Sequence, residues 1–215
     1  MKKKVFDIET EKVRLEALYV YERECLKNGF KLIGGTDEAG RGPFVGPVSA
    51  ACVILKEGFY IPGLDDSKKI KEAYREDLYE MILEQAVSYG IAMVDNNVID
   101  EINILNATKR AMGEAIGKMQ VKPYYLLTDY VELKDIDIPQ LPLVKGDSKS
   151  ASIAAASVLA KVTRDRFMKE VDVAYPMYGF ESNKGYGTKQ HIEALLAHGP
   201  CPLHRKSFIK KYLET

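Results

Sequence analysis

The sequence is short of the features that mark several large classes of protein. It has three cysteines among 215 residues, an odd number at scattered positions, which excludes a disulfide framework and favours a reducing compartment. No stretch approaches the roughly 18 consecutive apolar residues that a membrane-spanning helix needs. The basic start, MKKKVFDIETEK, has no apolar segment behind it and so does not resemble a secretory signal. We therefore expect a cytoplasmic protein that does not enter a membrane.

Charge of one sign is not in excess either, because 31 Lys and Arg residues balance 31 Asp and Glu residues. The distribution is nevertheless uneven. Residues 145–215 carry 12 basic and 7 acidic side chains, a net of +5, which leaves 19 and 24 over residues 1–144, a net of −5. This division fits an acidic metal-binding pocket beside a phosphate-binding surface, and it fits ordinary scatter equally well.

Several catalytic signatures are also absent. The sequence has no Gly-x-Ser-x-Gly motif and no Gly-x-Gly-x-x-Gly motif after a strand. The glycine-rich segment 34–46 has Gly40-Arg41-Gly42 where a nucleotide-binding P-loop needs Gly-Lys followed by Ser or Thr, and its two acids would repel phosphate. Cys201 and His204 have the spacing of half a zinc site, without a suitably spaced second pair. These observations disfavour serine hydrolases, P-loop enzymes, dinucleotide-binding enzymes and structural zinc.

The remaining patterns predict one mixed α/β domain, with helices packed on a sheet. We expect an N-terminal helical arm over residues 1–30 and a catalytic domain with C-terminal helices over residues 31–215. Glu22 interrupts the apolar stripe of the arm. Helices are expected over 8–27, 70–88, 97–119 (as one helix or two), 148–173, 188–197 and 208–213, strands over 32–33, 48–55, 89–94, 124–128 and 141–144, and a loop over 179–187.

Four acids stand where apolar runs end: Asp37, Glu38, Asp129 and Asp147. Ligands of open α/β sheets collect at strand ends, and four carboxylates cannot stay ionised together without compensation. Mg²⁺ supplies that compensation, and two such ions could clamp the attacking and leaving oxygens of a phosphodiester. Adjacent strand residues point to opposite faces, so Asp37 and Glu38 share a site only if the strand bends or ends there. A solvated turn with two acids is the alternative.

Other segments have the residue types that contact nucleic acid. The backbone of the Gly40–Gly42 loop could approach a sugar edge closely, which suits recognition of a 2′-hydroxyl. Tyr186 stands between two glycines with Lys184 adjacent, and it could stack on a nucleotide or simply pack within its turn. Residues 66–69 form a second basic turn. Further candidates for phosphate contacts, or for a solvated face, are Lys149, Lys161, Arg164 and Arg166.

Taken together, these motifs resemble bacterial ribonuclease HII. The resemblance covers the chain from about Tyr21 onward, and the set of motifs in this order is specific. Five segments carry it: GTDEAGRGPFVGPVSAACVIL, DDSKK, KGDSKSASIAAASVLAKVTRD, NKGYGT and GPCPLHRKSF. The resemblance implies an RNase H-like mixed sheet flanked by helices. It also implies a metal-dependent endoribonuclease that cleaves the RNA strand of RNA–DNA hybrids and incises 5′ of single ribonucleotides in duplex DNA, in ribonucleotide removal.

The same resemblance assigns roles to residues. It implies two ions, Mg²⁺ or Mn²⁺, held by Asp37, Glu38, Asp129 and Asp147, a 2′-hydroxyl contact at Gly40, Arg41 and Gly42, and a stacking ring at Tyr186. Further substrate contacts within the matched motifs are expected at Ser67, Lys68, Lys145, Ser148 and Lys184. One departure concerns the third acid, because the family often has Asp-Gly where this chain has Asp129-Tyr130.

Two other functions remain open at this point. A ribonuclease HIII-type enzyme would need longer RNA tracts, but that family typically has Gly-Lys-Gly and a larger N-terminal domain, so Arg41 and the short arm favour HII. A nucleic-acid binding module with purely structural acids is the non-enzyme alternative. We expect a monomer. The tail KKYLET carries no clear motif for a sliding clamp, so a clamp partner stays undetermined.

Overall fold

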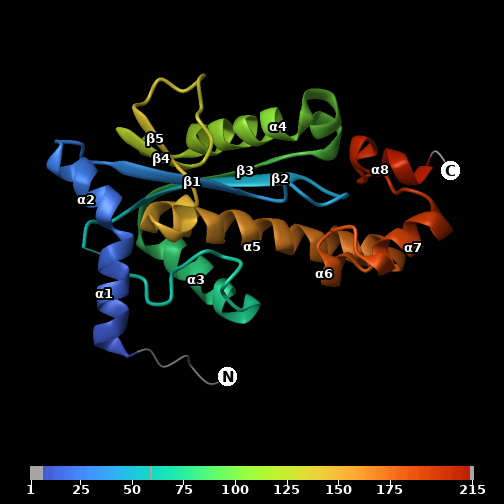
Figure 1. Ribbon diagram of the computed structural model, residues 1–215, viewed down its shortest axis with the longest axis horizontal. Helices are drawn as coiled ribbons and strands as arrows, with labels where there is room; N and C mark the ends of the chain where they lie inside the picture. Colours follow the sequence, from blue (N-terminus) through green and yellow to red (C-terminus); the bar gives the residue numbers. More distant parts are fainter. Residues whose placement is uncertain (1–6, 59, 214–215) are drawn as a thin grey trace.

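The computed structural model describes residues 7–58 and 60–213, and its central feature is a mixed sheet with helices on both faces (Figure 1). The five strands lie in the order β3-β2-β1-β4-β5. β2 pairs antiparallel with β1 on one side and with β3 on the other, whereas β4 runs parallel to β1 and β5 runs parallel to β4. The strands are β1 (Ile33–Ala39), β2 (Val48–Leu55), β3 (Ala86–Val94), β4 (Tyr125–Asp129) and β5 (Gln140–Leu143). The predicted fold class is confirmed.

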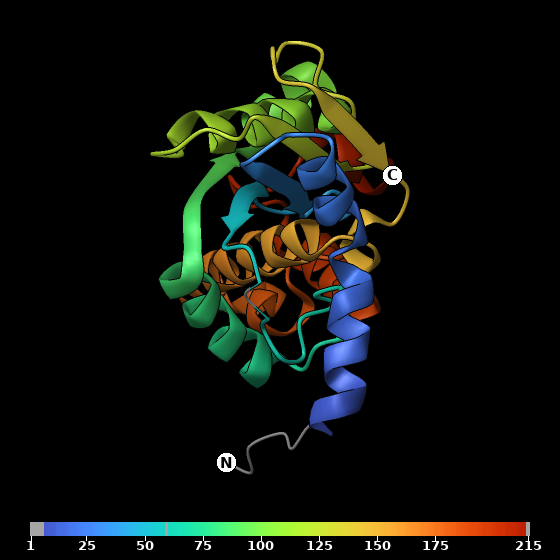
Figure 2. The ribbon, with the colours of Figure 1, turned by 90° about the vertical axis from the view of Figure 1, so that its left-hand side faces the viewer.

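Each face of the sheet packs against a long helix. Figure 2, which views the sheet from its end, shows α4 (Asn96–Lys118) on one side and α3 (Glu72–Gln85) with α5 (Ala151–Ala174) on the other. Side chains of β2 alternate between these layers: Ala51 and Val53 pack with α3 and α5, while Cys52 and Ile54 pack with α4. The continuous apolar run of β2 therefore reflects burial on both faces.

Two glycines allow the helices to lie directly on the strands. A Cβ atom at Gly35 of β1 would stand 2.1 Å from the carbonyl carbon of Ser152, in the first turn of α5. A Cβ atom at Gly90 of β3 would stand 2.0 Å from the carbonyl oxygen of Ala115 in α4. Backbone therefore meets backbone at both crossings, and the alanines of α5 extend this close packing along the helix.

The N-terminal arm differs from the single helix expected over 8–27. It forms α1 (Ile8–Leu18) and α2 (Val20–Lys27), which meet at Tyr19. Glu22, which interrupts the apolar stripe, is buried and accepts hydrogen bonds from Ser150 Oγ at 2.6 Å and Ser152 N at 2.8 Å. The arm is thus attached to the N-terminus of α5, where a carboxylate is favourable. A domain boundary near residue 30 stays a prediction.

The other elements follow the sequence pattern with local changes. α4 is interrupted at Asn103, whose φ is 66°, so the stretch is two helical pieces. β3 begins at Ala86 rather than Tyr89. A 3₁₀ turn, η1 (Gly146–Ser148), precedes α5, which starts three residues later than expected. The expected loop over 179–187 contains the short helix α6 (Phe180–Asn183), bounded on each side by a residue in the left-handed conformation.

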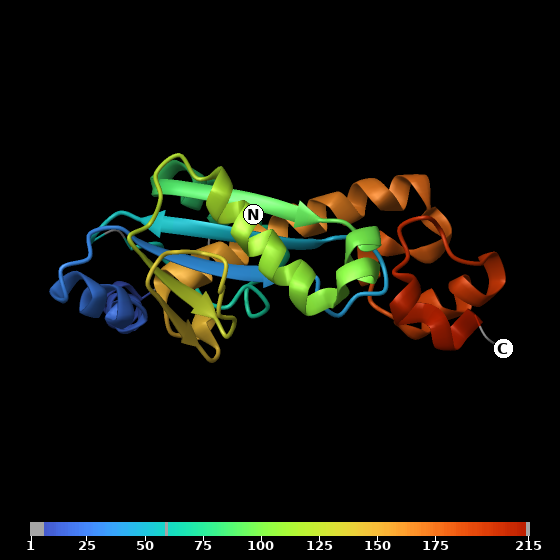
Figure 3. The same ribbon diagram turned by 90° about the horizontal axis from the view of Figure 1, so that it is seen from above.

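The C-terminal elements gather at the far end of α5, as Figure 3 shows. They are η2 (Pro176–Tyr178), α6, α7 (Lys189–His198) and α8 (Lys206–Leu213). A small core that includes Val45, Met168 and Phe180 joins them to the glycine-rich segment after β1. Among the described residues, no helix is long and apolar enough to cross a membrane.

Candidate active site

The predicted acids lie at one end of three neighbouring strands. In the parallel pair β1 and β4, Thr36 is the partner of Thr128, so Asp37 and Asp129 directly follow the last paired positions. β5 lies beside β4, with Leu143 opposite Asp129, and the chain continues from it into the turn that contains Asp147. Parallel pairing has therefore brought the acids of β1 close to Asp129 and Asp147, which lie about 90 and about 110 residues later in the sequence.

Asp37 and Glu38 are consecutive residues of β1, which continues to Ala39, so the strand does not end at these acids. Asp37 is buried, and its Oδ1 accepts a hydrogen bond from Glu38 N at 2.7 Å. Glu38 Oε1 lies 3.2 Å from Arg41 Nη1, while its Oε2 is buried and has no hydrogen-bond partner in the described part of the chain. Both carboxylates nonetheless interact electrostatically with Asp129.

Burial, together with the crowding of like charges, raises the pKa values of these acids. Burial raises the pKa of Asp37 well above its ordinary value, and the charges of Glu38 and Asp129 add to this. Burial also raises the pKa of Glu38, against the opposing effect of Arg41. The pKa of Asp147 is raised by burial and then by Asp66 and Asp129. Each shift means that the ionised form lacks compensating positive charge, which a divalent cation would supply.

Lys68 supplies part of that positive charge. Burial lowers its pKa, but the negative charges of Asp66, Asp37, Asp147 and Asp129 outweigh this effect, so the pKa is raised overall. Its ammonium group therefore lies within the field of the predicted metal-binding acids. A cation on a flexible side chain at this position can stabilise the carboxylates and can also contact a phosphate group.

As the side chains stand, no three His, Cys, Asp or Glu residues in 7–58 and 60–213 are grouped to hold a metal ion. Hydrogen bonds within the protein engage one oxygen each of Asp37, Glu38 and Asp129. Asp129 Oδ1 accepts from Gly146 N at 2.6 Å, and Asp37 and Glu38 have the partners given above. The donor set still fits a hard divalent cation, because every member offers oxygen and Glu38 Oε2 is a buried oxygen without a hydrogen bond.

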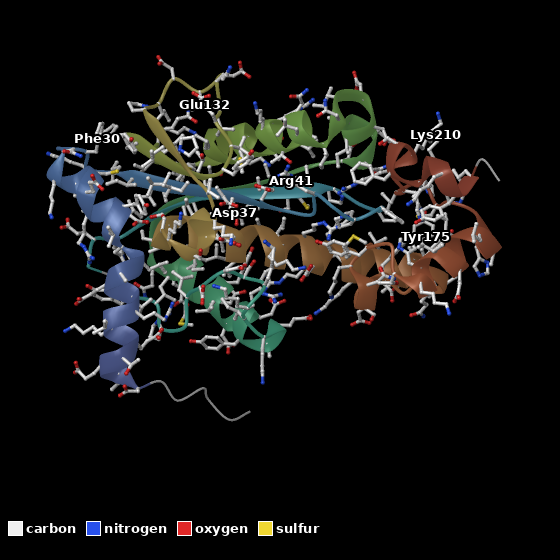
Figure 4. The ribbon with its side chains drawn as sticks, in the orientation of Figure 1. Phe30, Asp37, Arg41, Glu132, Tyr175 and Lys210 are labelled. Atoms are coloured by element: carbon white, nitrogen blue, oxygen red, sulfur yellow. The ribbon has the colours of Figure 1, made fainter. Side chains whose placement is uncertain are left out.

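A groove of about 630 Å³ adjoins these acids. Several predicted site residues line it together: Glu38, Gly40, Arg41, Gly42, Ser67, Lys68, Asp129 and Tyr186. The groove lies at the C-terminal ends of β1 and β4, the part of the molecule where Figure 4 labels Asp37 and Arg41. A Cβ atom at Gly42 would stand 3.4 Å from Cε1 of Tyr186, so the loop after β1 and the ring of Tyr186 face the same space.

The structure does not bring every predicted residue to the groove wall. Asp37 and Asp147 lie beside it and act through the charges described above. Lys145 and Ser148 are exposed in and before η1, with Ser148 Oγ donating to Lys145 O at 3.0 Å. Lys184 does not line the groove: its carbonyl oxygen accepts from Arg164 Nη1 at 3.0 Å, and its Nζ lies 3.9 Å from Glu72 Oε1.

Four further groove residues come from helices: Arg75, Ser157, Lys161 and Arg164. Arg75 and Ser157 line the groove and were not predicted, because each falls within a regular helical pattern. Ser157 Oγ lies 2.8 Å from Ser67 Oγ, which fixes the basic turn against α5. Lys161, one of several phosphate candidates in the sequence, also lines the groove and forms an ion pair of 2.6 Å with Asp165.

The half zinc motif has another role in the fold. Cys201 N donates to His204 Nδ1 at 3.0 Å, so the proton of a neutral His204 is on Nε2. That nitrogen lies 3.2 Å from His191 Nε2, and His191 Nδ1 lies 2.8 Å from the carbonyl oxygen of Tyr186. A carbonyl only accepts, so the chain of hydrogen bonds runs in one direction, from the C-terminal segment to the loop that carries Tyr186.

Comparison with known proteins gives a consistent assignment. A family model described as "Ribonuclease HII" matches residues 34–211. A ribonuclease HII of Caldanaerobacter subterraneus is 56% identical over 207 residues, which cover 96% of this chain and 86% of that protein. Another, from Clostridioides difficile, is 54% identical over 98% of this chain and 83% of its own length.

Solved structures agree with the fold. Ribonuclease H2 of Pyrococcus horikoshii superposes with a TM-score of 0.72 at 24% identity, over 86% of this chain and 98% of that one. The ribonuclease HII of Archaeoglobus fulgidus, solved as a complex with PCNA, gives 0.70 at 25% identity over 83% and 94%. A ribonuclease HIII described as Bst-RNase HIII, solved in complex with Mn²⁺, gives 0.60 at 18% identity over 85% and 69%.

The sequence matches cover the strands, the acids and the groove, and the solved relatives have the same sheet and helices. The protein is therefore a metal-dependent endonuclease of the ribonuclease H type, and the chain belongs to the ribonuclease HII family.

Proposed function

We propose that this enzyme hydrolyses the RNA strand of RNA–DNA hybrids and incises duplex DNA on the 5′ side of a single embedded ribonucleotide. One observation carries the proposal: the groove that holds Glu38 and Asp129 is also lined by Gly40–Gly42 and Tyr186. A site that joins metal-binding acids to a loop able to read a sugar hydroxyl favours cleavage directed by ribose.

The proposed ligands of the metal are Asp37, Glu38, Asp129 and Asp147, and the proposed metal is Mg²⁺ or Mn²⁺. Two bound ions would activate a water molecule for in-line attack on phosphorus and stabilise the leaving 3′-oxygen. The P–O3′ bond breaks, the 3′-oxygen takes up a proton, and the products carry 5′-phosphate and 3′-hydroxyl ends.

The protein groups around the acids orient the substrate in this proposal. Backbone groups of Gly40–Gly42 contact the 2′-hydroxyl, and the half-exposed ring of Tyr186 stacks on the adjacent sugar. Lys68 contacts a phosphate beside the acids. A site built to form a hydrogen bond with a substrate hydroxyl can reject the analogue without that hydroxyl by a factor of about 10⁴ or more.

Mapping of cut sites tests the proposal directly. Three duplexes of one sequence, carrying zero, one or four consecutive ribonucleotides, are incubated with Mg²⁺, with Mn²⁺ or with EDTA. We expect incision 5′ of the single ribonucleotide, cleavage within the tract of four, no cleavage of DNA, and no activity in EDTA. An enzyme of the HIII type would leave the single ribonucleotide intact, and a binding module would cleave none of the duplexes.

Tyr186→Ala tests the stacking role. We expect incision at a single ribonucleotide to fall at least about fivefold, taking the stacking of a base on an aromatic ring, about 1–3 kcal/mol, as the guide for this contact with the sugar. The melting temperature should stay close to that of the wild type because the ring is half exposed. Tyr124→Ala, an exposed tyrosine outside the groove, is the matched control. An unchanged rate in the Tyr186 variant would contradict the stacking role.

A further inference from the structure

Two arginines near the groove are fully buried without an acidic partner. Arg164 is 1% exposed and Arg205 is 0% exposed, and within the residues that the structure describes neither forms an ion pair. Buried arginines are ordinarily paired with carboxylates. Here backbone carbonyls take that place, and the acceptors of Arg205 belong to the loop that follows β1.

Arg205 holds this loop at three points. Its Nη2 donates to the carbonyl of Gly40 at 2.7 Å, its Nη1 to the carbonyl of Arg41 at 3.0 Å, and its Nε to the carbonyl of Gly46 at 2.9 Å. The guanidinium is planar and presents its donors in a fixed fork, so the directions of these carbonyls are set together.

Because a peptide group is planar, fixing the direction of a carbonyl also fixes the direction of the N–H group that follows it. In a trans peptide, the N–H of the next residue points away from the C=O of the preceding one. Because the carbonyls of Gly40 and Arg41 point toward Arg205, the N–H groups of Arg41 and Gly42 point the opposite way. Neither N–H donates to an acceptor within the described residues, and both residues line the groove.

The backbone around Arg205 makes it a fixed support. Arg205 N donates to Phe44 O at 2.7 Å, and Gly46 N donates to Leu203 O at 2.9 Å. Val45 and His204 form an antiparallel bridge between these contacts. The C-terminal segment is therefore paired with the same stretch of chain whose carbonyls its arginine binds.

We propose that Arg205 is a positioning residue that turns the N–H groups of Arg41 and Gly42 toward the groove and thereby sets the preference for a ribonucleotide over a deoxyribonucleotide. The proposal deepens the proposed function, because it rests on the assignment of Gly40–Gly42 to the 2′-hydroxyl. Arg205 itself touches no substrate. Its effect is exerted through the loop.

Arg205→Lys is the decisive variant, because lysine keeps the charge and loses the fork of donors. Affinities are measured in EDTA by fluorescence anisotropy for two duplexes that differ only in one ribonucleotide. We expect the wild type to prefer the ribonucleotide duplex about fivefold or more, which corresponds to a hydrogen bond of about 1 kcal/mol. In the variant the ratio falls to near one, while the affinity for the DNA duplex changes less than twofold.

Loss of stability alone must be separated from this effect. Ile82→Ala removes a buried side chain of α3 that does not line the groove, and it should lower the melting temperature while keeping the wild-type ratio of the two affinities. All measurements are made at least ten degrees below the melting temperatures of the variants. An Arg205→Lys enzyme that retained the wild-type ratio would overturn the proposal.

Chemical rescue provides a second route if lysine disturbs the loop too strongly. In Arg205→Ala, added ethylguanidinium should restore the ratio, and ethylammonium at the same concentration should not. Equal effects of the two compounds would also overturn the proposal. Two outcomes for the wild type separate this proposal from the proposed function. Incision at a single ribonucleotide in Mg²⁺ with equal binding of both duplexes would refute the positioning role of Arg205. Absence of incision with a clear binding preference would refute only the proposed function.

Discussion

At the scale of the residue, Tyr130 stands after Asp129, where the resemblance to ribonuclease HII would often place glycine. Its backbone has φ of 63°, in the left-handed region that only glycine adopts without strain. Its N–H donates to Leu143 O at 3.0 Å, and its side chain is 66% exposed. The turn is therefore kept in a glycine-like conformation by its neighbours, and the bulky side chain is directed to solvent.

Tyr130→Gly should consequently stabilise the protein by about 1 kcal/mol, because the strain of a left-handed tyrosine, about 1–2 kcal/mol, exceeds the added entropy of an unfolded glycine. Urea unfolding gives the free energy. The control is Tyr124→Gly, an exposed tyrosine that has no positive φ, which we expect to be neutral or destabilising. A destabilised Tyr130→Gly enzyme would mean that the side chain, not the backbone, determines this turn.

Asp37 illustrates a conflict between stability and chemistry. The carboxylate is buried near Glu38 and Asp129, and burial and both charges raise its pKa. Its Oδ1 accepts from Glu38 N, an interaction that an amide oxygen preserves, and an amide nitrogen could donate to the neighbouring carboxylates.

Asp37→Asn should therefore raise the free energy of unfolding in EDTA at pH 7, because the amide removes a buried charge that desolvation and the neighbouring carboxylates disfavour. Cleavage in Mg²⁺ should be almost abolished, while hybrid binding persists. Calorimetry and a cleavage assay measure the two effects. Asp77→Asn, on the exposed face of α3, should change neither. Full activity of the Asp37 variant would refute its role as a metal ligand.

At the scale of the element, the position of α5 over β1 determines where the acids meet. The helix crosses the strand at Gly35, two residues before Asp37 on the same face, and Ser157 of the helix forms a hydrogen bond with Asp37. The helix thus forms one wall of the site as well as half of the core.

Gly35→Ala should destabilise the protein by at least about 3 kcal/mol, because the new methyl group would meet backbone atoms that cannot move independently of α5. Gly117→Ala is the matched control: it lies in α4, and an added Cβ would meet nothing within 4 Å, so the gain in helix propensity should stabilise by about 0.5–1 kcal/mol. Thermal and urea unfolding give both values. Comparable changes in the two variants would contradict the close crossing.

At the scale of the whole molecule, the C-terminal helices are linked to the site through the chain of hydrogen bonds from Cys201 to Tyr186. The chain requires both histidines to be neutral. Burial, then the proximity of His191, lowers the pKa of His204 to about 4, and burial lowers the pKa of His191. An unfolded histidine takes up its proton near pH 6.5.

The stabilisation from His204 should therefore be complete above about pH 6.5 and should be lost as the pH falls toward about 4. His204→Gln keeps a donor toward His191 but does not titrate, so we expect the difference in unfolding free energy between wild type and variant to shrink over this range. The control is His198→Gln, which replaces an exposed histidine of α7. Its difference in unfolding free energy from the wild type should stay nearly constant over the same pH range. If the difference in unfolding free energy between the wild type and His204→Gln did not depend on pH, the two histidines could not both be neutral in the folded protein.

Much of this protein follows from the sequence alone. Hydrophobic periodicity is a local property, so most strands and helices lie within a few residues of the predicted ranges. The four acids were identifiable because each follows an apolar run, and strand ends are where an α/β sheet collects its ligands. The ribonuclease HII motifs then added roles that spacing by itself could not supply.

Only the tertiary structure decided which of these residues share a space. The parallel pairing of β1 with β4 puts Asp37 beside Asp129, and the close approach of Gly42 and Tyr186 joins two loops that are far apart in the sequence. An arginine at position 205 looks like a surface cation in the sequence, yet it is buried, because the carbonyls that satisfy its donors come from a segment about 160 residues earlier. Such contacts depend on how elements pack, and no local pattern encodes them.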